Sequence, residues 1–330
     1  MVAGVLLAAS FAVMVAGALV FTNAVEWLGV RLDLGHGAVG SVLAGVATAM
    51  PESLIPVVAI IGGRQGDAIA IGAIIGAPFL LATLAMAVAG GAALAYASRR
   101  ESARLRPDRR ATTRDLLAAV CALAVAISVG LLGTPVLRFA AAAVLLTAYA
   151  LVTWKTITRA RQEGAGAEPA RLYFNATRHG PPTMFQVLAQ TLVSLGLLVG
   201  AAQLFVSSVE QLARGLGADE LMLTLIIAPL ATELPEKLNS VVWVRQGKDT
   251  LAVGNITGAM VFQTMPLVAF GMIFTNWRLT APSLLAMLAA IAGAALSLIT
   301  LRRPGGWSAP VIGCWAGLYA GAIASIIAIA

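Results

Sequence analysis

Two carboxylates interrupt long apolar runs at matching places in this chain. Glu52 ends the segment 47–52 and Glu236 ends the segment 231–236, and both segments read A-T-x-x-P-E. A charged side chain inside a membrane costs roughly 2.5–3.5 kcal/mol on insertion scales, so two at equivalent positions require an explanation. Hard cations prefer several oxygen ligands, some of them charged. The pattern therefore predicts a cation site that uses Glu52 and Glu236 as metal ligands.

Further oxygen atoms accompany each glutamate. Thr48 and Thr232 stand three residues before Pro51 and Pro235. A proline inside a helix frees one main-chain carbonyl, and membranes tolerate this where the carbonyl lines a cavity buried in protein. We expect helices broken at the two prolines, with threonine and glutamate oxygens facing the gap. The alternative is that the glutamates only form hydrogen bonds between helices.

Three more polar residues lie close to these segments. Glu233 and Lys237 have the spacing of neighbours on one helix face. They form a local ion pair, or Glu233 is an additional ligand, or Lys237 takes the place of a bound cation. Asn255 is either a ligand or an interhelical hydrogen-bonding residue. Close helix packing is the role we expect for Gly72, Gly76, Gly254 and Gly258, which form small-xxx-small pairs.

Composition places these residues in a membrane. The chain is 59% hydrophobic and 11% charged, whereas soluble domains carry about 25% charged residues. Apolar runs of about 20 residues, enough to cross a bilayer, recur throughout. We predict an all-α integral membrane protein with spans near 2–24, 38–62, 67–97, 115–133, 136–157, 184–210, 219–243, 249–275, 279–300 and 309–328. The net charge of +7 resides in loops and does not indicate a nucleic-acid partner.

The basic residues predict the orientation. The loops reached after the first span and every second span thereafter hold 17 of the 22 Lys and Arg residues, and the opposite loops hold four. Cytoplasmic loops carry such an excess. We therefore expect a multi-pass protein of the plasma membrane with both termini on the non-cytoplasmic side.

The chain divides into two similar halves. A polar linker at 158–183 separates a first half, 1–157, from a second half, 184–330, with five predicted spans each. Residue pairs from Phe21/Phe205 and Glu26/Glu210 to Val58/Val242 share one offset of 184. Because five is odd, the second half starts from the other side of the membrane. The sequence predicts an inverted repeat that brings the two P-E segments together near the midplane.

Motifs of the common enzyme classes are missing from the sequence. It contains no HExxH, GxSxG or Walker pattern. We expect a protein that is not an enzyme and has no cofactor apart from the cations it transports.

The repeated segments resemble the α-repeats of the sodium/calcium exchanger family, in the calcium/cation antiporter superfamily. Each family repeat has G-T-S-L-P-E on one helix and G-N-x-x-G-S-N/D-x-F on the next. The resemblance implies a secondary active antiporter that works by alternating access. It implies that Glu52 and Glu236 coordinate calcium and sodium, that Thr48 and Thr232 lend main-chain carbonyls, and that Asn255 matches the family asparagine.

The sequence departs from the family pattern at several ligand positions, so it resembles a divergent, bacterial-type member. Ala49 and Glu233 follow the threonines where the family has serine. Pro78 and Met260 stand where it has Asn or Asp, and Ala77 and Ala259 where it has serine. Calcium, sodium and protons are thus the candidate cations. The alternatives are a cation/proton exchanger with altered ion choice and a membrane scaffold that transports nothing.

Overall fold

The computed structural model describes residues 2–31, 50–62, 66–100, 102–162, 170–175, 180–302 and 306–329. These residues are almost entirely helical. The main helices are α1 (Val2–Arg31), α4 (Met50–Gly62), α5 (Gly66–Leu80), α6 (Met86–Ala95), α7 (Arg109–Leu132), α8 (Pro135–Gln162), α9 (Met184–Leu216), α10 (Glu220–Arg245), α11 (Asp249–Phe262), α12 (Val268–Phe274), α13 (Ala281–Leu301) and α14 (Ala309–Ile329). The short elements are the π-helical turns η2 (Leu81–Ala85) and η5 (Gln263–Leu267) and the 3₁₀ turns η3 (Ala97–Arg99) and η4 (Tyr173–Asn175).

Eight helices among the described residues are long and apolar enough to cross a membrane. They coincide with the first, third to sixth and eighth to tenth predicted spans. At the predicted second and seventh spans the structure has α4 and α10, in which the apolar parts among the described residues, Glu52–Gly62 and Glu220–Leu230, are shorter. The all-helical membrane architecture is confirmed, and the number of ten spans stays a prediction.

The predicted break at Pro235 is not observed. Helix α10 continues from Glu220 to Arg245 in one piece. A proline removes a single hydrogen bond, and the bonds on either side of it can keep a bent helix continuous. Pro51 is the second residue of α4, where the helix needs no N–H from it. Residues 32–49, which include Thr48, lie outside the described residues.

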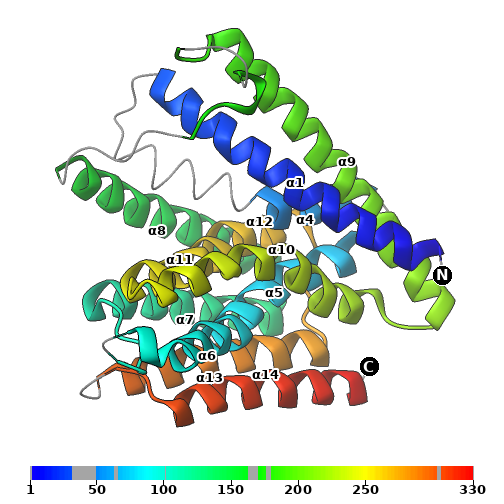
Figure 1. Ribbon diagram of the computed structural model, residues 1–330. Coiled ribbons are helices and arrows are strands. Elements are labelled where there is room, and N and C mark those ends of the chain that lie inside the picture. Colours follow the sequence, from blue (N-terminus) through cyan, green and yellow to red (C-terminus); the bar gives the residue numbers. More distant parts are fainter. Residues whose placement is uncertain are drawn as a thin grey trace.

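One span forms the centre of the bundle. Nearly every residue of the continuous segment α5–η2–α6 is buried, whereas α8 and α14 mostly face outward. Ile69, Ala70 and Ala73 on one side of α5 join an apolar cluster with α1, α4 and α9, and Ile71 and Ile74 join the larger cluster of the remaining helices. A helix that is hydrophobic all round is expected to be buried in this way. Figure 1 shows the long pair α1 and α9 on one side and α13 and α14 on the other.

Glycine allows α5 to touch the backbone of α10. A Cβ atom added to Gly72 would lie 2.6 Å from the carbonyl oxygen of Leu221, and one added to Gly76 would lie 2.3 Å from that of Leu225. The close packing predicted for this pair of glycines is confirmed. At Gly254 and Gly258 no described atom lies within 4 Å of the corresponding position.

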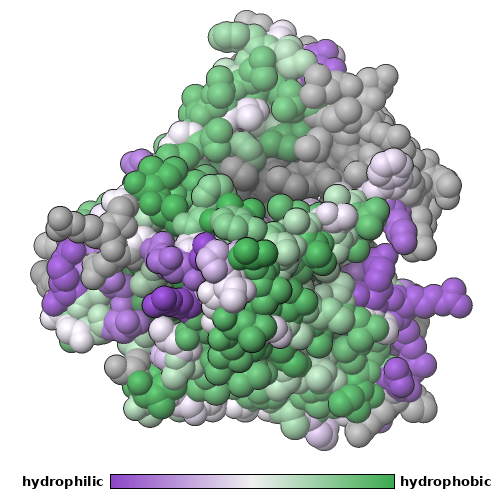
Figure 2. Space-filling model, turned by 180° about the vertical axis from the view of Figure 1, so that it is seen from behind, coloured by the Kyte–Doolittle hydropathy of each residue, from purple (hydrophilic) through white to green (hydrophobic). Residues whose placement is uncertain are grey.

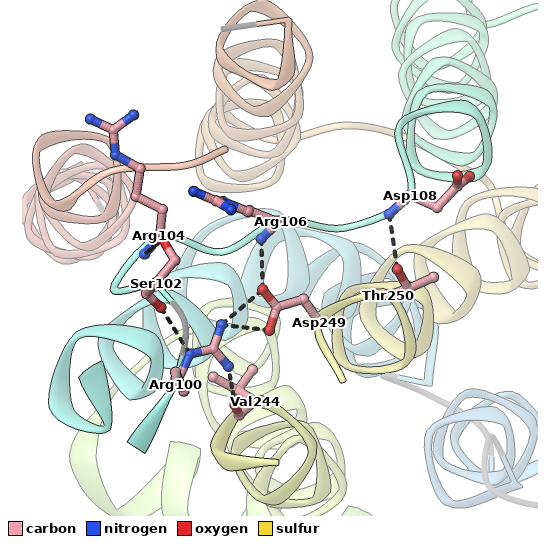
Figure 3. Close-up of polar contacts among 8 residues, drawn as sticks. All are labelled: Arg100, Ser102, Arg104, Arg106, Asp108, Val244, Asp249 and Thr250. Atoms are coloured by element: carbon pink, nitrogen blue, oxygen red, sulfur yellow. Dashed lines mark hydrogen bonds and ion pairs between the residues drawn. The ribbon is translucent and has the colours of Figure 1, made fainter. Parts of the chain in front are cut away.

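The third and eighth spans run antiparallel. Beyond the end of α6, Arg100 Nη2 lies 2.7 Å from Asp249 Oδ1 at the start of α11, in a buried ion pair (Figure 3). At the other end, Asp67 at the start of α5 accepts hydrogen bonds from the main-chain and side-chain nitrogens of Asn276, which follows α12. Since each span begins where the other ends, two contacts fix their opposite directions.

Part of the predicted linker folds against the ends of α1 and α9. Asn23 Nδ2 and Trp27 Nε1 on α1 donate to the carbonyl oxygen of Ala170, at 2.9 Å and 2.8 Å. Gln190 Nε2 on α9 donates to Asn23 Oδ1, and Gln190 Oε1 accepts the N–H of Phe174. This segment therefore ties α1 to α9. The division into halves at 158–183 stays a prediction.

The outer surface matches a membrane environment. Figure 2 shows a broad hydrophobic face, with hydrophilic residues gathered mainly toward the two sides of the view. On this face the helices run between the two sides, so polar residues gather toward the helix ends and apolar residues lie between them.

Candidate functional site

A carboxylate and a carboxamide meet in the interior of the bundle. Glu233 on α10 and Gln263 at the start of η5 are both fully buried, with 0% of each residue exposed. Gln263 Nε2 donates a hydrogen bond to Glu233 Oε1. Gln263 Oε1 is also buried and accepts no hydrogen bond from the residues that the structure describes. Buried polar atoms are nearly always partnered, so this amide oxygen is a candidate for contact with a cation or a proton donor.

A local change of helix type positions Gln263. The turn η5 interrupts the span between α11 and α12, and it contains Pro266, which cannot donate a main-chain hydrogen bond. Such π-helical turns are frequent at functional sites because they shift the register of side chains. The turn η2 occupies the matching place in the other span: Asp67 precedes Leu81 by 14 residues, as Asp249 precedes Gln263. The first half supplies a leucine at this place, so the two halves differ there in polarity.

Glu52 is the buried acid of α4. It lies in the first turn of that helix and is 5% exposed. A carboxylate in this turn is favoured by the positive end of the helix dipole. Helix α4 contacts both α5 and α10, which brings Glu52 into the same central group of helices as Glu233.

The structure describes the other predicted site residues unequally. Thr232 is buried, and its hydroxyl donates to the carbonyl oxygen of Ala228 at 3.0 Å within its own helix. The backbone of Glu236 and Lys237 is part of α10, but their side chains are not among the described parts of the chain. Thr48 lies wholly outside the described residues. A pairing of Glu233 with Lys237 is therefore not tested.

Asn255 makes an interhelical contact. Its Nδ2 lies 3.3 Å from Ser240 Oγ on α10, and Ser240 Oγ donates to the carbonyl oxygen of Ala252 at 3.2 Å. Of the two roles predicted for this residue, hydrogen bonding between helices is the one with a described partner. The role as an ion ligand stays a prediction.

The replaced family positions are apolar and mostly buried. Pro78 lies inside α5 and Met260 inside α11, and both are buried, as is Ala77, while Ala259 is partly buried. None of their side chains carries an oxygen. Gln263 lies three residues after Met260. Its buried Oε1 is a neutral oxygen that receives no hydrogen bond from the described residues.

Sequence reasoning missed Gln263. Its signal was one amide in an otherwise apolar stretch, five residues after Gly258. Among the described residues no three His, Cys, Asp or Glu side chains form a metal-binding group. The buried groups among the described residues are thus carboxylates on different helices and one amide oxygen. Such oxygen ligands suit a hard cation.

The chain is similar to known proteins in sequence and in fold. CaxA of Alkalimonas amylolytica, described as a candidate antiporter, is 29% identical over 106 residues, which are 32% of this chain and 33% of CaxA. The chain thus matches about a third of the length of that curated relative.

Solved exchanger structures share the fold. The H⁺/Ca²⁺ exchanger CAX has a TM-score of 0.66 at 17% identity, over 99% of this chain and 88% of that chain. Native YfkE has a TM-score of 0.67 at 14% identity, over 98% and 99% of the two chains. The sodium-calcium exchanger NCX_Mj has a TM-score of 0.58 at 18% identity, over 98% of each.

The family profile described as "Sodium/calcium exchanger protein" matches residues 2–158 and 187–328. These two ranges include α1, α4 to α7 and α10 to α13, nearly all of α8, α9 and α14, and with them Glu52, Glu233 and Gln263. The chain therefore belongs to the sodium/calcium exchanger protein family.

Proposed function

We propose that this protein is a secondary active cation antiporter that binds its cargo at buried carboxylates and works by alternating access. The observation that carries the proposal is the fully buried pair of Glu233 and Gln263. The Oε1 atom of Gln263 accepts no hydrogen bond from the described residues. Leaving such an atom unsatisfied costs roughly 1–3 kcal/mol. A bound cation at this atom would offset that cost.

The proposed ligands come from both halves of the chain. Glu52 and Glu236 supply one carboxylate each, and Glu233 supplies a third. Thr48 and Thr232 supply main-chain carbonyls, since the Thr232 hydroxyl is engaged with Ala228. Asn255 and Gln263 are the amide candidates, and Gln263 also holds Glu233 in place through its Nε2.

An inverted repeat of ten spans gives this site its means of transport. The matching positions of η2 and η5 and the antiparallel third and eighth spans support the repeat. In inverted repeats, substrate and ion sites lie near the midplane, and one part of the protein rocks against the other. The excess of basic residues supports termini on the non-cytoplasmic side of the plasma membrane.

Calcium is the proposed cargo, exchanged for protons or sodium. The solved neighbours are a H⁺/Ca²⁺ exchanger, a Ca²⁺/H⁺ antiporter and a sodium-calcium exchanger. Calcium takes six to eight oxygen ligands. Pro78 and Met260 contribute none, and a smaller ligand set favours a proton, carried by a glutamate, as the exchanged ion.

Flux in proteoliposomes tests the function. Purified protein is reconstituted, and uptake of radioactive calcium and sodium is followed together with the internal pH. We expect calcium uptake driven by an outward proton or sodium gradient. It should be abolished by Glu52→Gln and by Glu236→Gln. Gln263→Leu should weaken calcium affinity by about 10- to 100-fold, as loss of a group that orients a ligand does.

A matched control is Glu210→Gln. Glu210 is partly exposed on α9 and lies 3.8 Å from Arg214 as a surface ion pair, so its loss should leave flux unchanged. Absence of any calcium, sodium or proton flux, or flux that survives both Glu52→Gln and Glu236→Gln, would refute the proposal.

The scaffold alternative makes a separate prediction. A cation that binds the folded protein raises its stability by about 2.7 kcal/mol at a hundred times the dissociation constant. We expect calcium to raise the melting temperature of the wild type in detergent and not that of Glu52→Gln. A melting temperature that no cation changes, together with unaffected glutamate variants, would favour the scaffold.

A further inference from the structure

An apolar groove lies on the surface of the pair α1 and α9, which run side by side (Figure 1). It has a volume of about 400 Å³ and is lined by Val13 of α1 and by residues of α9 that include Val193, Gly196 and Gly200. Both glycines are exposed, and no described atom lies within 4 Å of the position that a Cβ atom would take on either of them. The missing side chains therefore leave a depression that the proposed antiport does not use.

An unpaired amide adjoins this groove. Gln203 lies three residues after Gly200, is exposed, and has no hydrogen-bond partner in the part of the chain that the structure describes. It is the one polar side chain among residues 195–206. The next ionisable residue, Glu210, comes seven positions later, about 10 Å along a helix. The Gln203 amide thus belongs to the apolar part of a span, where lipid chains offer it no hydrogen bond.

The exposed residues Val193, Gly196, Gly200 and Gln203 form one side of α9, called the α9 face below. They are spaced three, four and three residues apart, as are the contact positions of two helices that wrap around each other. In membranes, glycines four residues apart let helices approach closely, and glutamine side chains form hydrogen bonds across the contact. The opposite side of α9 packs into the apolar cluster with α1 and α4. The α9 face therefore has the features of a helix contact, yet it is exposed in the single chain.

The Gln203 amide restricts what can cover this face. The partner must be apolar or small over most of its surface and must offer hydrogen-bonding groups at the depth of Gln203. An acyl chain fills the groove but leaves the amide unpaired. A second copy of this chain meets both conditions, because a primary amide carries both a donor and an acceptor and can pair with its own kind. A two-fold axis along the membrane normal brings the same face of both copies together at the same depth.

We propose that the α9 face is the interface of a homodimer in the membrane, in which α9 packs against α9 of a second copy. The glycines let the two helices approach, and the two Gln203 amides exchange hydrogen bonds across the axis. This interface does not depend on ion transport, and its test requires no flux.

Helix α14 offers a matched control. Gly313 and Gly317 are also exposed and four residues apart, with no described atom within 4 Å of their Cβ positions. However, α14 contains no amide side chain. Leucines at these two positions therefore add the same bulk to a lipid-facing helix without touching the α9 face.

Self-association in lipid vesicles tests the interface. Full-length protein labelled with donor or acceptor dyes is reconstituted at increasing protein-to-lipid ratios, and energy transfer between copies is measured. We expect a dimer whose dissociation constant rises about 3- to 20-fold in Gln203→Leu, as loss of an interhelical hydrogen bond predicts. Gly196→Leu with Gly200→Leu should abolish the dimer, whereas Gly313→Leu with Gly317→Leu should leave it unchanged.

The glycine variants are expected to fold. Neither added side chain meets a described atom, and leucine favours a helix more than glycine does. Thermal unfolding in detergent should therefore show that both double variants are at least as stable as the wild type. If the α9 double variant does not fold, Gly200→Leu alone is measured against Gly317→Leu.

Several results would overturn the proposal. A monomer at every protein-to-lipid ratio would leave the groove to lipid chains. A dimer that survives the α9 substitutions, or that the α14 substitutions weaken equally, would place the contact elsewhere or make it unspecific. A dimer of Gln203→Leu as strong as that of the wild type would exclude paired amides.

Discussion

Replacing Asp249 with alanine should lower the free energy of unfolding strongly, because the Asp249 carboxylate is buried and paired with Arg100. Asp249 accepts hydrogen bonds from Arg100 Nη2 at 2.7 Å and 2.8 Å and from the N–H of Arg106 at 2.7 Å (Figure 3). The Arg100 and Asp249 side chains are only 4% and 8% exposed. The substitution leaves a buried guanidinium without this counter-charge, and its remaining partners among the described residues are the carbonyl oxygens of Val244 and Ser102.

The magnitude follows from this burial. Removing one partner of a buried ion pair costs about 3–5 kcal/mol, because the remaining charge stays desolvated. At roughly 2 °C per kcal/mol for a chain of this size, the melting temperature should fall by about 6–10 °C. Replacing both partners, with Arg100→Met and Asp249→Leu, should restore part of the loss since no charge is then buried alone.

Asp67 provides the matched control. It occupies the equivalent place at the start of the third span, but it is only partly buried, and its described hydrogen bonds come from Asn276 and not from an arginine. Asp67→Ala should cost about 1–2 kcal/mol. Both variants are compared by thermal unfolding in the same detergent. Equal losses at Asp67 and Asp249, or a double variant worse than Asp249→Ala, would show that the ion pair does not hold these span ends together.

Two further predictions concern packing and the linker. Gly76→Val should abolish stable folding because its Cβ would lie 2.3 Å from the carbonyl oxygen of Leu225, whereas Gly91→Val, with no described atom within 4 Å, should leave the yield of monodisperse protein nearly unchanged. Gln190→Leu removes the acceptor of the Phe174 N–H and the donor to Asn23 Oδ1. The free energy of unfolding should fall by about 1–3 kcal/mol, and a protease should cut the segment 170–175 faster.

The sequence revealed the class of the protein because the relevant signals are local and repeated. Long apolar runs identify spans wherever they pack, and in the part of the chain that the structure describes eight of them appear as helices of sufficient length. The spacing of the P-E segments and of the glycines does not depend on tertiary contacts either. Glu52 was found in this way, and its burial agrees with a role inside the membrane. Gly72 and Gly76 were likewise identified as packing residues.

The tertiary structure was needed wherever a residue depends on a distant partner. Nothing local distinguishes Gln263 from an amide that faces a headgroup. It becomes a candidate site residue because α10 places Glu233 beside it. Arg100 looked like one of many loop arginines until the antiparallel packing of two spans put it against Asp249. Pro235 was expected to break a helix, yet α10 continues through it. In each case the outcome depends on packing between segments far apart in sequence, which composition and spacing do not encode.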